Sequence, residues 1–174
     1  MEYKFYNLAL RFLSYRPRSE KEVRDRLNIK YQSFDKAQDR KSNIKNLTLV
    51  IDKVIQKLKE QKFINDEEFA KWWIESRLRF RPRSINLIKK ELLQKGIERD
   101  IIDGQISNLI HSTGSGQISN DLQQAKKLIE KRIERFRNLT KQEIYQKLGR
   151  YLASKGFDWE TIKQSIDEVI LKGV

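Results

Sequence analysis

The chain has 174 residues and no cysteine, and its 37 Lys and Arg against 24 Asp and Glu give a formal net charge of +13. The missing cysteine excludes disulfides and thiolate chemistry, and no apolar run approaches the roughly 20 residues that span a bilayer. The N-terminal stretch lacks the apolar core and small-residue cleavage site of a secretory signal, so we expect a soluble cytoplasmic protein with no membrane partner. With 38% hydrophobic and 35% charged residues, the composition favours a row of small modules over one large core.

Apolar residues recur at intervals of three and four along nine segments, and each such stripe predicts one amphipathic helix. The abundance of Leu, Ile, Lys, Glu, Gln and Arg also favours helices, while seven glycines and two prolines leave few turns for an all-β fold. In chain order the stripes are Phe5, Leu8, Ala9 and Phe12; Val23 and Leu27; Ile51, Val54, Ile55 and Leu58; Phe69, Trp73 and Phe80; Ile85, Ile88 and Leu92; Ile102, Ile106 and Leu109; Leu122, Ala125, Ile129, Ile133 and Phe136; Ile144, Leu148 and Leu152; and Ile162, Ile166 and Val169.

One phrase occurs twice, as YRPRS from Tyr15 and as FRPRS from Phe80, and it contains both prolines of the chain. Pro17 and Pro82 disfavour the helical conformation at the preceding arginine, so each of them ends a helix. The serine that closes the phrase has the chemistry to begin the next helix. The phrase therefore predicts a helix end followed directly by a helix start.

Three positions carry helix-capping chemistry. Ser19 and Glu22 have the spacing of a capping box, in which the hydroxyl accepts a bond from a free backbone N–H and the carboxylate reaches back to the cap. Thr140 and Glu143 repeat this spacing in the last third of the chain. Ser84 has no carboxylate three residues on, so we expect it to cap with its hydroxyl alone. We expect these residues to stabilise the fold and not to bind a partner.

Gly96 and Gly156 each follow an apolar stripe, where a residue in the left-handed conformation stops a helix. The order helix, capped turn, helix, short turn, helix then recurs, which predicts an all-α fold of three tandem three-helix repeats in an elongated arrangement. The predicted boundaries are 1–62 for the first repeat, with a polar insertion at 30–46; 63–110 for the second; 111–117 for a flexible linker; and 118–174 for the third.

The basic residues are clustered. Between Arg77 and Arg99 there are eight basic and two acidic residues, and between Lys126 and Arg150 nine basic and three acidic. A solvated helix surface explains many charges but not this imbalance, so we expect a polyanionic partner: nucleic acid, an acidic protein surface or anionic lipid. The candidate binding residues are Arg16, Arg18, Arg77, Arg79, Arg81, Arg83, Lys89, Lys90, Lys131, Arg132, Arg135 and Arg137.

Within the second phrase we expect the arginines to serve binding. Arg79, Arg81 and Arg83 flank the turn, where their side chains are expected to fan outward from a fixed backbone. Ser84 and Pro82 are expected to serve the fold. Removing Arg81 and Arg83 together should then leave stability nearly unchanged.

Chemistry for catalysis is missing from the sequence. His111 is the only histidine and there is no cysteine, so we expect no metal site. No G-x-x-x-x-G-K-[ST] motif is present, and the carboxylates lie on helix faces among lysines as salt-bridging groups do. We expect a protein that is not an enzyme and needs no cofactor. Trp73 falls on an apolar stripe and is expected in a core, and Trp159 is expected as a lid on the third repeat.

Four stretches together resemble the RecX family. They are FINDEEFAKWWIESRL from Phe63 to Leu78, RSINLIKKELLQKGI from Arg83 to Ile97, and the segments ALRFLSYRPRSEKEVRDRL and GRYLASKGFDWETIKQSI in the first and last repeats. The resemblance covers nearly the whole chain outside residues 30–46. The first repeat departs from the pattern because the insertion replaces a Lys-Gly turn, and the third because it has no proline in its motif.

The resemblance implies three tandem three-helix repeats in an elongated, curved arrangement that lies in the groove of a filament of the RecA recombinase on DNA. A RecX-like regulator there would restrain ATP hydrolysis and strand exchange, in recombination, DNA repair and the SOS response. The expected partners are the RecA filament and, weakly and without sequence preference, single- and double-stranded DNA. We expect the protein to be a monomer.

Two other functions fit the residues. The first is a stand-alone, sequence-independent DNA-binding helical protein that uses a capped helix or a basic stripe, since short-helix architectures also occur among DNA readers. The second is a basic amphipathic protein on anionic membranes, which is the weaker alternative because no predicted helix has a strongly exposed aromatic face.

Overall fold

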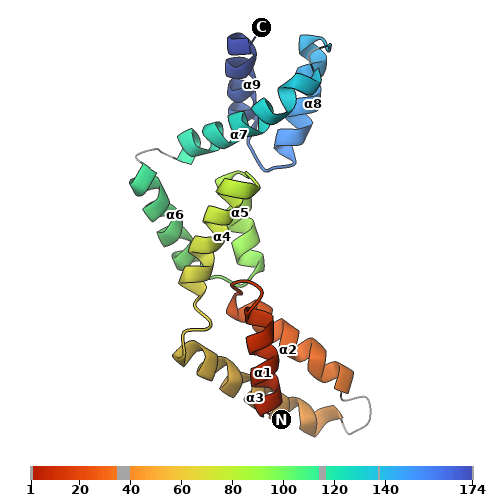
Figure 1. Cartoon of the computed structure of the whole chain (residues 1–174), viewed down its shortest axis with the longest axis vertical. Coiled ribbons are helices and arrows are strands. Elements are labelled where there is room, and N and C mark those ends of the chain that lie inside the picture. The colour runs from red at the N-terminus through yellow and green to blue at the C-terminus, as the bar shows by residue number, and fades with distance from the viewer. Residues whose placement is uncertain (1, 35–39, 114–116, 137, 174) are drawn as a thin grey trace.

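The computed structural model describes residues 2–34, 40–113, 117–136 and 138–173. Within these ranges the backbone forms nine α-helices and one short 3-10 helix, and no strand. The helices form three groups of three that follow one another along the long axis of the molecule, in an elongated and curved row (Figure 1). The prediction of an all-α fold of three tandem three-helix repeats is confirmed.

The first group, called unit 1 below, consists of α1 (Glu2–Leu13), α2 (Glu20–Phe34) and α3 (Arg40–Glu60). Its apolar faces meet in a core formed by Phe5, Ala9, Val23, Leu27, Ile51, Val54, Ile55, Leu58 and Ile64. Most of these residues belong to the predicted stripes. Ile64 does not, and it joins this core from the turn that follows α3.

Unit 2 consists of α4 (Asp66–Phe80), α5 (Ile85–Gln94) and α6 (Arg99–Thr113), and unit 3 of α7 (Gln117–Ile133), the 3-10 helix η1 (Glu134–Phe136), α8 (Lys141–Ala153) and α9 (Trp159–Gly173). Each unit has a core of its own. That of unit 2 is formed by Phe69, Ala70, Trp73, Ile74, Ile85, Ile88, Leu92, Ile97, Ile102 and Ile106, and that of unit 3 by Ala125, Leu128, Ile129, Leu148, Leu152, Phe157, Ile162 and Ile166. Since the cores are separate, the polar contacts between units are important for how one unit is placed against the next.

Helices extend further into the polar stretches than the sequence suggested. Residues 30–34 continue α2 and residues 40–46 begin α3, so within the expected insertion only residues 35–39 lie outside the described part of the chain. Likewise α6 continues through residues 111–113, and residues 114–116 of the expected linker lie outside the description. A helix that has already formed adds one hydrogen bond for each further residue, and Lys, Gln and Arg oppose this extension little.

Two aromatic residues lie at the surface instead of in the cores. Phe80 is 69% exposed, so its place on the stripe of α4 was predicted wrongly. Trp159 is also 69% exposed and does not cover unit 3 as a lid. Phe80 is the last residue of α4 and Trp159 the first of α9. At a helix end the periodicity no longer fixes which way a side chain faces, because the neighbouring turn is absent.

The helix starts have the following caps. The Ser84 hydroxyl accepts a bond from the N–H of Leu87, and Thr140 forms a capping box with Glu143. Ser19 and Glu22 exchange bonds of the same kind, at 3.2 Å from the Glu22 N–H to the Ser19 hydroxyl and 3.4 Å from the Ser19 N–H to the Glu22 carboxylate. The side chain of Asn65 caps α4, a helix for which the sequence analysis named no cap.

Unit 1 is joined to unit 2 through the start of α2. The hydroxyl of Ser19, which is fully buried, donates a 2.7 Å hydrogen bond to the carbonyl of Lys95 at the end of α5. The ammonium of Lys21 donates at 3.1 Å to the preceding carbonyl, that of Gln94. In return the Lys95 ammonium lies 2.7 Å from the carboxylate of Glu22. We call this set of contacts the first joint; it satisfies carbonyls that a helix end would leave free.

Unit 2 is joined to unit 3 in the same way, and we call these contacts the second joint. The Ser84 hydroxyl donates a 2.6 Å hydrogen bond to the carbonyl of Gly156, and the Ser84 N–H donates at 3.1 Å to the carbonyl of Lys155. The serine of the repeated phrase therefore has two roles. It begins a helix in its own unit, and it fixes that helix to the turn after the second helix of the next unit.

Glycine is required in these turns for two reasons. Gly96 and Gly156 have φ of 80° and 85°, a conformation that side chains oppose. In addition, a Cβ atom on Gly96 would lie 2.8 Å from the side chain of Lys21, and one on Gly156 would lie 2.6 Å from the Cβ of Leu87. These distances are shorter than carbon atoms tolerate, so the glycines also let the preceding unit approach.

An aspartate completes each joint. Asp66 accepts a 2.9 Å hydrogen bond from the N–H of Glu20, and Asp121 accepts one of 2.9 Å from the N–H of Ile85. Burial raises the pKa of Asp121 to about 6, and the nearby carboxylate of Asp158 acts in the same direction, while the bond from Ile85 opposes them. The second joint thus contains a carboxylate that titrates close to neutral pH.

The row of units predicts the size of the molecule in solution. A compact globule of this length would have a radius of gyration of about 16 Å, and three units placed end to end should clearly exceed that value. Small-angle X-ray scattering measures this quantity directly. A radius near the compact value would contradict the arrangement.

Gly156→Ala should disrupt the second joint. The left-handed conformation and the contact with Leu87 together should lower the free energy of unfolding by about 2 to 4 kcal/mol. Gly104→Ala is the matched control, because this glycine lies within α6 and a Cβ there would meet nothing within 4 Å. That change should stabilise the protein by about 0.5 to 1 kcal/mol through helix propensity. Urea unfolding of both variants tests the pair, and equal effects would contradict the close approach.

The stability of the protein should depend on the ionisation of Asp121. Because its folded pKa, about 6, lies above the ordinary 3.8, the stability it contributes is fully present below about pH 4 and is lost as the pH rises through 6. Asp121→Asn keeps the acceptor oxygen without the charge. Relative to this variant, the parent should lose on the order of 2 kcal/mol between pH 4 and 7. Urea unfolding at several pH values measures the difference, and a constant difference would show that Asp121 does not titrate in this range.

Candidate protein and nucleic-acid interaction surface

Glu91 in α5 holds together two of the candidate cations. It accepts hydrogen bonds from the Nε of Arg77 at 2.7 Å and from the indole of Trp73 at 2.9 Å, and its second oxygen contacts the guanidinium of Arg83. The side chain of Glu91 is only 11% exposed, and the Arg77 guanidinium lies 4.0 Å from the centre of the Trp73 ring. Arg83 therefore does not fan outward from the turn as expected, because a carboxylate of its own unit pairs with it.

Arg16 in the first phrase is also paired within the protein. Its guanidinium donates to both oxygens of Glu22, at 2.8 and 3.3 Å, and Lys95 lies on the same carboxylate. Burial alone would raise the pKa of Glu22, but the hydrogen bonds from Arg16 and Lys95 outweigh it and hold that pKa below its usual value. Arg16 thus stabilises the ionised carboxylate of Glu22, which belongs to the first joint.

Other cations in and near the second phrase have no carboxylate partner among the described residues. Arg79, Arg81 and Lys90 are exposed, and no carboxylate among the described residues forms an ion pair with them. Lys89, in contrast, pairs with Asp103 at 2.7 Å. We call Arg79, Arg81 and Lys90 the turn cations; they can bind an anion without breaking an existing pair.

Unit 3 carries a second group of candidate cations, Lys131, Arg132 and Arg135, which we call the unit 3 cations. Lys131 and Arg135 are exposed near the end of α7, and Arg132 lies 3.9 Å over the ring of Tyr151. The ammonium of Lys155 lies 5.4 Å from the same ring. Arg137, the remaining candidate, lies outside the described residues. Cations stacked on an aromatic ring suit phosphates and nucleobases alike.

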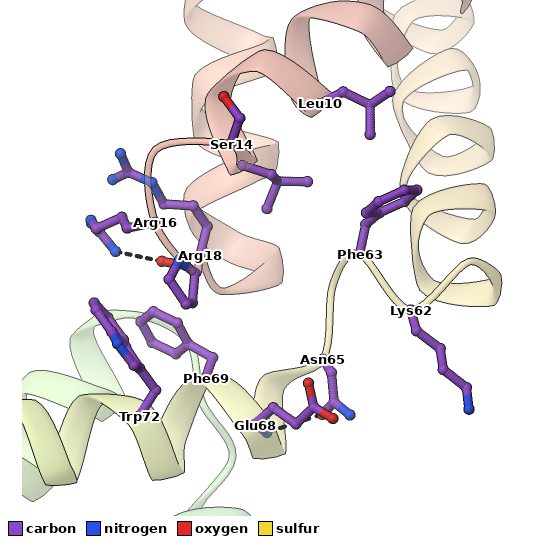
Figure 2. A pocket seen from close by; sticks show the side chains of 12 residues that line it. Leu10, Ser14, Arg16, Arg18, Lys62, Phe63, Asn65, Glu68, Phe69 and Trp72 are labelled. Atoms are coloured by element: carbon purple, nitrogen blue, oxygen red, sulfur yellow. Dashed lines mark hydrogen bonds between the residues drawn. The ribbon is translucent and has the colours of Figure 1, made fainter.

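A pocket of about 590 Å³ lies beside the first joint, between the end of α1, the turn of the first phrase and the start of α4. Figure 2 shows Phe63 and Leu10 on one side of it, and Arg16 and Trp72 on the other. Leu13 and Phe69 add further apolar surface. This volume is within the range of pockets that take small ligands or single side chains.

Arg18 lines the same pocket and forms no ion pair with a carboxylate among the described residues. Its guanidinium lies 4.0 Å from the centre of the Phe12 ring, and its Nε is buried without a hydrogen-bond partner. Burial lowers the pKa of Arg18, and the charge of Arg16 nearby adds to this effect. Glu22, the carboxylate that acts against it, is already bound by Arg16. A cation in such surroundings is stabilised by any anion that reaches it.

A metal-binding cluster and a membrane-spanning helix are both absent from the described ranges. No group of three or more His, Cys, Asp or Glu side chains there could hold a metal ion. None of the helices that the structure describes has both the length and the apolar character needed to cross a bilayer.

Asp66 and Asp121, which complete the two joints, were not among the residues predicted from the sequence. A signal for them is present in the sequence, since Asn-Asp precedes an alanine of the core at the same spacing in both places. The pairs are Asn65-Asp66 before Ala70 and Asn120-Asp121 before Ala125. Repetition of a polar pair beside a buried alanine indicates a fixed contact.

The fold and this surface define a class of protein: a row of three three-helix repeats, joined by buried serines, with cations on its outer turns. Three family models describe the first, second and third three-helix domains of RecX, and they match residues 6–32, 65–104 and 119–166 in that order. The chain belongs to the RecX family.

The relatives share most of this chain. It is 30% identical to the regulatory protein RecX of Clostridioides difficile over 98% of this chain and 70% of that protein. It is 30% identical to the regulatory protein RecX of Bacillus subtilis over 95% of this chain, but it covers only 55% of that protein. The crystal structure of RecX from Lactobacillus salivarius matches with a TM-score of 0.67 at 27% identity, over 98% of this chain and 97% of that one.

Proposed function

We propose that this protein binds the RecA filament on DNA and restrains its ATP hydrolysis and strand exchange, as a regulator in recombination and DNA repair. The observation that carries the proposal is the match of three successive RecX domains along a chain whose units are joined end to end. The protein would act as a monomer in the cytoplasm, by binding alone and without a cofactor.

The arrangement of the units suits a long partner with a repeating structure. The turn cations and the unit 3 cations lie on successive units of one row, so they can reach successive anionic groups along an extended ligand. Arginine forms bidentate bonds with both carboxylates and phosphates, so a filament of protein and DNA offers it two kinds of partner. Bare DNA offers only phosphates, and we expect it to bind more weakly and without sequence preference.

Arg79→Ala together with Arg81→Ala should weaken the inhibition of RecA. Both side chains are exposed and have no carboxylate partner among the described residues, so thermal stability should change by no more than about 0.5 kcal/mol. The concentration needed to halve the DNA-dependent ATPase rate of RecA should rise about tenfold, as expected for two lost charge-assisted contacts. Steady-state ATPase assays measure this change.

The matched control removes two exposed charges elsewhere. Lys4→Ala with Lys163→Ala lowers the net charge equally, from α1 and α9, and should change the inhibition less than twofold. If the two double variants lose inhibition equally, total charge and not the turn is responsible. If the parent protein leaves the ATPase rate of RecA unchanged, the proposed function is wrong.

Bare duplex DNA distinguishes the alternative, a stand-alone DNA-binding protein. For binding to phosphates the logarithm of the association constant falls with the logarithm of the salt concentration by about 0.9 per phosphate contacted. Binding to bare DNA that equals binding to the filament would favour this alternative. Its support is the net charge of +13.

A further inference from the structure

The pocket beside the first joint contains an apolar side chain that belongs to none of the buried cores. Phe63 is 52% exposed and belongs to the buried core of neither unit 1 nor unit 2, whereas the next residue, Ile64, is buried in the core of unit 1. Figure 2 shows that Phe63 projects into the pocket from the turn between α3 and α4. The exposed half of the Phe63 side chain can contact an apolar group that enters the pocket.

The opposite side of the pocket carries an incompletely compensated charge. Arg18 stacks on Phe12 and keeps a buried Nε without a hydrogen-bond partner, while the neighbouring Arg16 is already paired with Glu22. The partly buried guanidinium of Arg18 has no carboxylate of its own in the described part of the chain, and a carboxylate brought by a ligand would compensate its charge. The pocket thus offers apolar surface and a guanidinium to one occupant.

The backbone at the edge of the pocket supports a function in binding. Lys62 has φ of 60°, the left-handed conformation that is typical of glycine at a helix end. Its N–H donates to the carbonyl of Lys59, so it occupies the same kind of turn that Gly96 and Gly156 occupy elsewhere in the chain. Lys62 thus adopts a conformation that lysine disfavours, and its side chain lines the pocket.

We propose that this pocket receives a peptide segment of a protein partner, in which a large apolar side chain stands next to an aspartate or glutamate. The apolar side chain contacts Phe63 and Leu10, and the carboxylate binds the guanidinium of Arg18. This site is an addition to the proposed function, which assigns no role to the pocket.

A nucleic acid fits the pocket less well than a peptide. The lining includes Leu10, Leu13 and Phe63, whose apolar surface offers no hydrogen bond to a phosphodiester backbone. The volume of about 590 Å³ accommodates a single large side chain and its neighbours but not a run of nucleotides. The observations therefore favour an acidic, apolar peptide.

The test uses the full chain and a fluorescein-labelled peptide, acetyl-Gly-Asp-Phe-Glu-Gly. Saturable binding by fluorescence anisotropy is expected, together with chemical-shift changes at the amide of Phe63 and the indole of Trp72. A peptide with Asn and Gln in place of Asp and Glu should bind at least about tenfold more weakly, because each charged hydrogen bond is lost. No saturable binding, or equal binding of both peptides, would overturn the proposal.

Three variants assign the effect to the pocket. Arg18→Gln should weaken binding about tenfold, whereas Arg11→Gln, which removes an equal charge from an exposed residue of α1 outside the pocket, should change it less than twofold. Lys62→Gly should weaken binding about threefold, the effect of one exposed charge, without lowering the midpoint of urea unfolding. This last variant separates binding from folding, because glycine suits the backbone better than lysine. Equal losses for Arg18→Gln and Arg11→Gln would mean that general charge attraction is responsible.

The last measurement is a competition of the labelled peptide with an oligonucleotide. If single-stranded DNA displaces the peptide and depends on Arg18 to the same extent, the occupant is a nucleic acid and the proposal fails. The outcome does not depend on RecA. If the parent leaves the ATPase of RecA unaffected but binds the peptide as described, the proposed function fails while the pocket stands.

Discussion

The arrangement of the whole molecule depends on a serine hydroxyl buried at each joint. Ser19 is fully buried and Ser84 is 1% exposed, and each donates to a carbonyl of the next unit while it accepts a backbone N–H at the start of its own helix. A buried hydroxyl must be satisfied in this way or it destabilises the fold. Because the three units have separate cores, these polar contacts, with the glycine turns that receive them, set how one unit follows the next.

The same constraint determines which charges remain for a partner. At the first joint Arg16 and Lys95 share the carboxylate of Glu22, and in unit 2 the carboxylate of Glu91 binds Arg77 and Arg83. These cations stabilise the protein itself, so the net charge overstates what is available for binding. The cations without a carboxylate partner among the described residues, Arg79, Arg81 and Lys90, are exposed and lie in or near the turn between α4 and α5. Within the second phrase Arg83 is paired with Glu91, while the exposed Arg81 has no carboxylate partner among the described residues.

Local patterns predicted the helices and the caps, because periodicity and capping chemistry act over a few residues of chain. They could not predict the partners of Glu91, which lie 8, 14 and 18 residues away and meet only once α4 and α5 pack together. Asp121 is a similar case, since its partner Ile85 belongs to another unit. Hydrophobic periodicity indicates which residues of one helix are buried. It therefore gives no information on a joint that is made of polar groups. Periodicity also did not predict that α2 and α3 extend into the polar stretch at residues 30–46, because a helix extends by its own hydrogen bonds even where it has few apolar residues.

The two joints share a serine, an aspartate and a glycine turn, but the charges around them differ. At the second joint the Cβ of Leu87 lies so close to Gly156 that a side chain there would clash. At the first joint the Cβ of Lys21 lies similarly close to Gly96, so this steric constraint is common to both joints. The first joint also contains the ion pairs of Glu22 with Lys95 and Arg16, which salt screens. Salt should therefore weaken the first joint more than the second. The pocket with Phe63 and Arg18 lies beside the first joint, since Arg16 lines the pocket and binds the carboxylate of Glu22.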